Sequence, residues 1–370
     1  MPGKFGTSYN ARQLFAEWLS QGLIDADQQT QLEQYSTTRK YEPGLPLYLH
    51  VLVGIGALIA LSCFIGFLAV AEIIKFNSSP GLIFWGIFFM LGAVLLEMAP
   101  VDRENAIRHS FLMQASFCLM ATGKILLVAG IALQFDKEEW GISVGALVVT
   151  ALVYFVYPIS IDRFLSSLAV LISIFVNLLM TRFEPDTQAM LLNAFFVAQL
   201  GAAAILMTSG RITQLYVPIA YALIASLSFE VLTFASQTQI GYWGHHYNFS
   251  PAIINISLTA TLIALIGWAA GGMERLKTEA LAVAALGAVC LGIVSAPGIL
   301  LAVGLMTLGY ARHERLLLFS GALLFPVFLS LYYYNLDLTL MLKSGVLVGG
   351  GAVLLAGRAY MHYRGFDREI

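Results

Sequence analysis

The chain has 370 residues, of which 59% are hydrophobic and only 11% are charged, with a formal net charge of −2. Soluble globular domains carry about 25% charged residues, so the composition excludes an ordinary soluble domain and does not indicate a nucleic-acid partner. The charged residues gather before residue 47 and in short segments between apolar runs of about 20 residues, which are long enough to cross a bilayer as helices. These runs are continuously apolar rather than alternating, which favours helices over barrel strands.

Residues 1–46 are predicted to form a short cytoplasmic helical hairpin followed by a linker. Leu14 and Trp18 lie at helical spacing and give the first helix an apolar face. Asp25 and Gln28 form a capping-box pattern at the start of the second helix. Because the hairpin is too small for a core of its own, we expect it to dock on the membrane surface or on loops of the same chain.

Residues 47–357 are predicted to form a bundle of about twelve transmembrane helices, so the predicted fold class is an all-α integral membrane protein. The predicted spans are 51–73, 81–98, 111–133, 140–160, 164–180, 188–207, 214–234, 252–270, 280–296, 298–310, 316–334 and 338–357. The run 298–310 is short for a span, which leaves open a single kinked helix over 280–310. Such a helix would be about 46 Å long, too long for a hydrocarbon core of about 30 Å without steep tilt.

The distribution of positive charge favours two separate spans. With twelve spans, about fifteen Lys and Arg residues lie on the inner side of the membrane and three on the outer side, as the positive-inside rule expects. Merging the two runs would move the last five inner arginines outside. We therefore predict cytoplasmic termini, with residues 358–370 as a short tail.

Lys124 is the strongest candidate for chemistry, because it lies near the middle of the run 111–133. A charge at bilayer depth costs at least ~2.5–3.5 kcal/mol, so the lysine should face the bundle interior and have a partner. It would then serve either a substrate or proton pathway or a structural pair that fixes helix register. The partner would be a carboxylate or an oxygen from another span, and the intramembrane amides are Asn177, Asn193, Gln199 and Asn255.

Four more ionisable residues are predicted to lie near the outer ends of spans. Glu72, Glu230 and Lys343 fall within the ends of their spans, and Asp337 lies in the polar elbow between the last two. They would form either a polar vestibule at the outer mouth or ordinary interfacial pairs.

Enzyme, cofactor and metal signals are missing from the sequence. It contains no Walker loop, no HExxH and no GxGxxG after a strand, so we expect no catalytic residues and no cofactor. His245 and His246 have no Cys, Asp or Glu in their loop to complete a tetrahedral site, so no metal is expected. Three glycine pairs have the spacing of close helix packing, namely Gly141 with Gly145, Gly267 with Gly271, and Gly345 with Gly349.

Two stretches resemble uncharacterised bacterial membrane proteins. Residues 14–25, Leu-Phe-Ala-Glu-Trp-Leu-Ser-Gln-Gly-Leu-Ile-Asp, followed by Leu32 and Tyr35, resemble the opening of a family of predicted membrane proteins of unknown function. Residues 332–344, Tyr-Tyr-Tyr-Asn-Leu-Asp-Leu-Thr-Leu-Met-Leu-Lys-Ser, resemble the closing pattern of a related domain of unknown function. The resemblance covers under a fifth of the chain. It implies a multi-pass protein of the bacterial inner membrane, encoded in some members beside a small membrane-anchored protein of GDYXXLXY type, and it implies no activity.

Two functions are therefore weighed. The first is a membrane scaffold or sensor that works with an envelope partner, which the scarcity of intramembrane charges favours. The alternative is a secondary transporter or channel-like protein for a small solute or ion that uses Lys124. A water-filled cavity around this lysine would favour transport, and a closed pair with one carboxylate would favour a scaffold.

Overall fold

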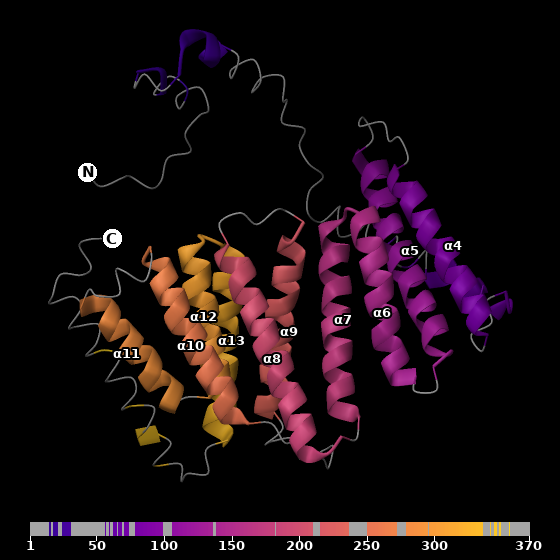
Figure 1. Cartoon of the computed structure of the whole chain (residues 1–370). Helices are drawn as coiled ribbons and strands as arrows, with labels where there is room; N and C mark the ends of the chain where they lie inside the picture. Colours follow the sequence, from indigo (N-terminus) through magenta and orange to yellow (C-terminus); the bar gives the residue numbers. More distant parts are fainter. Residues whose placement is uncertain are drawn as a thin grey trace. The chain divides into compact units, whose positions relative to one another are not determined.

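The computed structural model is helical, with no strand, in the parts of the chain that it describes (Figure 1). These are residues 15, 18–20, 24–30, 56, 59, 62–64, 66–68, 70–73, 78–98, 106–135, 138–181, 183–209, 215–236, 250–271, 279–294, 296–335, 341, 344–345, 348 and 355. The main helices are α4 (Ser79–Met98), α5 (Ala106–Ala132), α6 (Glu138–Val156), α7 (Ser160–Met180), α8 (Pro185–Thr208), α9 (Val217–Ser236), α10 (Pro251–Ala269), α11 (Glu279–Val294), α12 (Pro297–Ala311) and α13 (Arg315–Asn335).

Membrane embedding is the property that length and composition support most directly. Among the described residues, seven helices are long and apolar enough to cross a bilayer: α4, α5, α7, α8, α9, α10 and α13. The apolar helices α6, α11 and α12 are shorter. The all-helical membrane class is thus confirmed. The number twelve stays a prediction, because only 12 of the 23 residues of the expected span 51–73 and 5 of the 20 residues of the expected span 338–357 are described.

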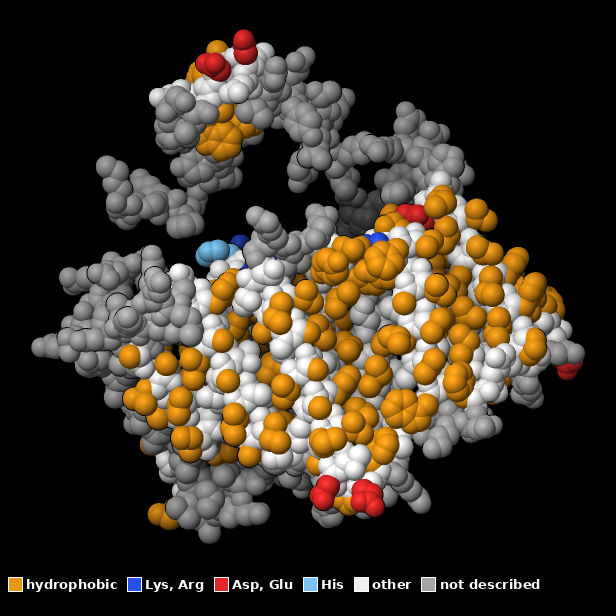
Figure 2. Space-filling view, viewed as in Figure 1, with side chains coloured by type: hydrophobic (Ala, Val, Ile, Leu, Met, Phe, Trp, Pro, Cys, Tyr) orange, Lys and Arg blue, Asp and Glu red, His pale blue; other side chains and the backbone are white. Residues whose placement is uncertain are grey.

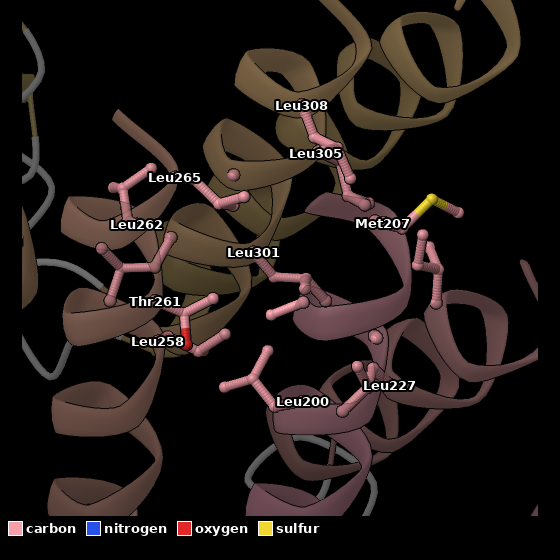
Figure 3. A pocket seen from close by; sticks show the side chains of 15 residues that line it. Leu200, Met207, Leu227, Leu258, Thr261, Leu262, Leu265, Leu301, Leu305 and Leu308 are labelled. Atoms are coloured by element: carbon pink, nitrogen blue, oxygen red, sulfur yellow. The ribbon is translucent and has the colours of Figure 1, made fainter. Parts of the chain in front are cut away.

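The run 280–310 forms two helices rather than one kinked helix. Ala296 has extended backbone angles, φ −74° and ψ 151°, and α12 begins with Pro297. Gly292 near the end of α11 approaches Thr259 of α10, and the short segment 272–278 joins the two helices, so α11 is antiparallel to α10. In contrast, α12 is parallel to α10, because successive leucines of both line one small cavity in the same order (Figure 3). The chain therefore reverses direction between α11 and α12.

The chain divides into two compact units, with the boundaries inside α4 and α5. The first unit comprises residues 1–76 and 85–123, and the second comprises 77–84 and 124–370. In the first unit, the Ser116 hydroxyl donates to the Ala93 carbonyl at 2.8 Å. Gly123 allows α5 to approach α4, since a Cβ there would lie 2.8 Å from the Gly86 carbonyl oxygen.

The core of the second unit is centred on α9. Within the described part of the structure, 56% of the α9 span is buried, whereas only 17% of the α13 span is. Lipid tails are as apolar as leucine, so such helices associate through close packing rather than through the hydrophobic effect. Figure 2 accordingly shows a broad hydrophobic surface over the helices, with charged side chains at its edges. Fully buried side chains that fill the core include Phe175, Phe196, Leu227, Ile254, Leu300 and Phe328.

The glycine pairs differ in their roles. Gly141 and Gly145 pack α6 on α5, because a Cβ at these positions would lie 2.8 Å from the Ala132 Cα and 3.4 Å from Ile131. This spacing therefore marks a helix contact, as predicted. Gly271 instead follows the end of α10 with φ 90°, a helix-ending conformation that glycine adopts readily. At Gly345 an added Cβ would meet no atom within 4 Å among the described residues, so the predicted packing role of this glycine has no support there.

Only part of the predicted N-terminal hairpin is described. Residues 26–30 are helical, and the Asp25 amide donates to Gln28 Oε1 at 3.0 Å, which is the reciprocal bond of a capping box. The rings of Phe15 and Trp18 lie 5.9 Å apart. The capping interaction is confirmed. The complete hairpin and its docking stay predictions, because most of residues 1–46 lie outside the described part.

Candidate functional site

Polar side chains join several helix ends of the second unit at one end, which we call the arginine end after Arg163 and Arg312. Arg163 Nε donates to the Tyr154 carbonyl at 2.8 Å, and its guanidinium lies over the Tyr154 ring. Arg312 Nη1 donates to the Met207 carbonyl at 2.6 Å. The Tyr221 hydroxyl donates to Glu314 Oε2. The ends of α6, α8 and α12 and the starts of α7, α9 and α13 therefore meet at one end, as alternating spans require.

Lys124 forms a closed ion pair near this end. Its Nζ lies 2.5 Å from Asp162 Oδ2 and donates to Ser166 Oγ at 2.7 Å. The lysine side chain is 12% exposed and the aspartate side chain 5% exposed. Because Asp162 lies in the first turn of α7 and Ser166 one turn later, the ammonium lies level with the first two turns of α7.

The start of α7 differs from the sequence-based boundary. The predicted span began at residue 164, with Asp162 and Arg163 in a loop, whereas α7 begins at Ser160. The first turn of a helix favours an acidic residue, and the bond to Lys124 compensates the buried carboxylate. None of the four amides considered as partners bonds to Lys124 in the hydrogen bonds of the described residues.

Glu230 forms a second buried polar group, between α8 and α9. Gln199 Nε2 donates to Glu230 Oε1 at 2.5 Å, and Ser226 Oγ, one turn earlier on α9, donates to the same oxygen at 3.0 Å. The glutamate is 1% exposed and the glutamine 4% exposed. Two other oxygens of this group, Glu230 Oε2 and Gln199 Oε1, are buried without a hydrogen-bond donor from the described residues.

The remaining predicted site residues are not brought into either group. Glu72 belongs to the first unit, where it is exposed with φ 54°. The Ile73 amide donates to the Leu68 carbonyl at 3.0 Å, so Glu72 occupies the left-handed position of a helix C-terminus. Asp337 and Lys343 lie outside the described residues. The predicted vestibule at the outer mouth is thus untested.

A large groove of the second unit lies between α7, α9 and α13. Its volume is about 970 Å³, and its lining runs from Ser160 to Phe164 on α7, from Val217 to Ser228 on α9, and from Leu316 to Leu324 on α13. The lining contains no charged side chain, and its polar groups are the hydroxyls of Ser160, Tyr221, Ser228 and Ser320. Such a surface suits hydrocarbon rather than a charged solute.

The second cavity is small and nearly all apolar. It has a volume of about 50 Å³ and lies between α8, α9, α10 and α12 (Figure 3). Leu200, Leu258 and Leu301 project into it, and Thr261 is the one hydroxyl in its lining. The Thr261 hydroxyl already donates to the Ser257 carbonyl of its own helix at 2.8 Å, so the cavity offers a polar solute little to bind. Elsewhere in the described residues, no group of three His, Cys, Asp or Glu side chains could hold a metal ion.

The comparison with protein families identifies the chain. Residues 46–364, which include every helix from α4 to α13, match a domain of unknown function (DUF4401). The chain belongs to the DUF4401 family. The sequence-based resemblance to an uncharacterised family is confirmed, and DUF4401 membership assigns no activity. No curated protein and no solved structure gives a significant match to this DUF4401 chain.

Sequence reasoning missed the partners of the buried Lys124 and Glu230 and also the groove. Asp162 stood next to an arginine and was therefore placed in a loop, although an aspartate at the start of an apolar run is also typical of a helix first turn. Ser226 precedes Glu230 by four residues, which puts both on one helix face and was a usable signal. The groove carries no sequence signal, because it depends on how far α7 and α13 stand apart across α9.

Proposed function

We propose that this DUF4401 protein is a scaffold of the bacterial inner membrane, with cytoplasmic termini, that binds the membrane segment of a small envelope partner in the groove between α7, α9 and α13. The partner is the small membrane-anchored protein of GDYXXLXY type that the family resemblance implies. The proposal includes no catalytic activity and no cofactor.

The observation that carries the proposal is the contrast between the groove and Lys124. The groove is a large cavity of the second unit, and its lining is mainly apolar and uncharged. Lys124 does not line it; the lysine is bonded to Asp162 and Ser166 instead. A solute carrier needs polar groups that converge on its cavity, whereas a groove for a helix needs apolar shape.

The dimensions of the groove support a helical occupant. From Val217 to Ser228 the groove extends about 16 Å along α9, at 1.5 Å per residue. The wall helix α13 also has the lowest buried fraction of the seven candidate spans within the described structure, so it has surface left for a partner.

The test is co-expression of the chain with its small membrane-anchored neighbour, followed by purification through a tag on the neighbour. Ala225 lies in the groove lining, so Ala225→Phe should fill the groove and reduce recovery of the complex by about tenfold or more. Ala198→Phe is the matched control, because Ala198 is exposed on α8 and does not line the groove.

A photo-crosslinking residue identifies the occupant directly. Placed at Leu323 in the groove, it should crosslink the partner, and placed at Phe319, an exposed residue of the same helix outside the lining, it should not. Equal recovery with Ala225→Phe and wild type, or crosslinks from Leu323 to lipid alone, would contradict the proposal.

One observation favours the alternative, a secondary transporter. Glu230 is a buried carboxyl group in a span, and such groups belong to proton relays in many carriers. Complementation of a deletion strain separates the two functions. A carrier that uses Lys124 should lose function when both Lys124 and Asp162 are replaced by apolar residues, whereas a scaffold that uses the groove should keep it.

A further inference from the structure

The group formed by Glu230, Gln199 and Ser226 has one unusual feature, which is an excess of acceptors. Glu230 Oε1 accepts two hydrogen bonds, from Gln199 Nε2 at 2.5 Å and from Ser226 Oγ at 3.0 Å. Glu230 Oε2 and Gln199 Oε1 are both buried and receive no donor from the described residues. Buried polar atoms are nearly always bonded, so two such oxygens on one bonded pair of side chains require an explanation.

An ionised carboxylate does not provide that explanation. No Lys, Arg or His of the described residues has a nitrogen within 4.0 Å of Glu230, so the negative charge would lie 1% exposed and without a cation. Burial of an uncompensated charge is unfavourable, and such groups are neutralised by taking up a proton. A bound metal ion would need more oxygens, since Ca²⁺ takes six to eight and Mg²⁺ six.

We propose that Glu230 holds a proton on Oε2 and forms a cyclic acid–amide pair with Gln199, so that the two residues constitute a proton-binding site inside the membrane domain. In this pair the Glu230 hydroxyl donates to Gln199 Oε1, and Gln199 Nε2 donates to Glu230 Oε1. A single proton on Glu230 Oε2 thus makes that oxygen a donor and supplies Gln199 Oε1 with its hydrogen bond. The site goes beyond the proposed scaffold, which does not use Glu230.

Other charged groups lie at helix ends rather than beside Glu230. Helix α9 packs against α7, α8, α12 and α13. The titratable residues of these five helices are Asp162, Arg163, Asp186, Tyr221, Tyr310, Arg315, Tyr332, Tyr333 and Tyr334. Asp162, Arg163 and Tyr221 belong to the arginine end, and Glu230 is nine residues beyond Tyr221, about 13 Å along α9. Asp186 is in the first turn of α8, about 20 Å before Gln199 along the helix axis.

The first experiment is infrared spectroscopy of the full-length protein in nanodiscs at neutral pH. The wild-type spectrum minus the Glu230→Gln spectrum should contain the C=O band of a protonated carboxylic acid, shifted in D₂O. The control is Glu184→Gln, a change at an exposed residue, whose difference spectrum should contain carboxylate bands. Carboxylate bands in the Glu230 difference spectrum would overturn the proposal.

Two further measurements extend the test: the thermal stability of Glu230→Gln and the infrared band of Gln199→Met. Glutamine supplies the same donor and acceptor as a protonated glutamate and takes up no proton on folding, so Glu230→Gln should melt at or above the wild-type temperature at neutral pH. At alkaline pH the wild type should lose both the acid band and thermal stability, while Glu230→Gln keeps its stability. Gln199→Met should shift the acid band toward that of a carboxylic acid without a hydrogen-bond acceptor. Failure of Glu230→Gln to fold, or an acid band that Gln199→Met leaves unchanged, would also refute the proposed pair.

Discussion

The ion pair between Lys124 and Asp162 allows a double-mutant cycle with a large expected signal. From the sequence alone, Lys124→Met is expected to be neutral or stabilising if the lysine is structural. The structure changes that expectation, because the single replacement leaves the Asp162 carboxylate with 5% side-chain exposure and no cation. Breaking a buried pair from one side costs about 3–5 kcal/mol.

The double variant Lys124→Met/Asp162→Leu removes both charges together. Replacement of a buried ion pair by apolar residues of similar volume is neutral or stabilising by about 1–4 kcal/mol. The double variant should therefore recover at least about 3 kcal/mol relative to Lys124→Met, and Asp162→Leu alone should be destabilised in the same direction as Lys124→Met.

Thermal unfolding in detergent measures the cycle. At roughly 2–4 °C per kcal/mol, each single variant should melt roughly 6–20 °C below wild type and the double variant close to it. Ile125→Met is the control, since Ile125 is exposed and its replacement should change stability by less than about 0.5 kcal/mol. A Lys124→Met protein as stable as wild type would show that the pair is not formed. If the double variant were as unstable as the single variants, the Lys124 and Asp162 side chains would stabilise the protein through contacts other than their mutual ion pair.

Three backbone positions give further predictions. Gly304→Ala should stabilise the protein by about 1 kcal/mol, because alanine is the better helix former and its Cβ meets no atom within 4 Å. Gly309→Ala in the same helix should destabilise by about 1–3 kcal/mol, because its Cβ would lie 2.9 Å from the Leu318 Cα; equal melting temperatures for the two variants would refute the close approach of α12 and α13. Glu72→Gly should stabilise the first unit by about 0.5–1 kcal/mol, since glycine adopts φ 54° without strain. Glu72→Ala should give no such gain, and equal gains from both variants would attribute the effect to the charge instead.

The helix boundaries were predictable where apolar runs end at proline or at polar residues. The predicted span 188–207 corresponds to α8, which begins at Pro185, and the span 81–98 corresponds to α4. The start of α7 was predicted four residues late, because Asp162 joins the helix through a bond to Lys124, thirty-eight residues earlier in the chain. A contact at that separation depends on tertiary structure and leaves no trace in hydropathy.

The ionisable residues of the site could be predicted from the sequence, but the side chains that they bond could not. The cost of a charge in a membrane span indicated that Lys124 needs a partner, and Lys124 lies in an ion pair with Asp162. The sequence did not indicate that Glu230, expected near an outer span end, bonds to Gln199. These bonds depend on helix packing. Lys124 reaches Asp162 because α5 packs near α7, and Glu230 reaches Gln199 because α8 and α9 bring the two residues to the same level. A lysine side chain also extends several ångströms along its helix, so the position of Lys124 in its run did not give the level of its ammonium group.

The positions of the two buried polar groups bear on where a partner binds this DUF4401 protein under the proposed function. Lys124 and Asp162 lie at the arginine end, and Glu230 lies in the last third of α9, toward the opposite end. The cavities described in the second unit are lined mainly by apolar side chains, and neither lining includes any of these three residues. The two groups thus bond neighbouring helices at separate levels of the second unit, and neither group lines the groove or the small cavity. Under the proposed function, the partner binds at the face where α7, α9 and α13 enclose this uncharged groove.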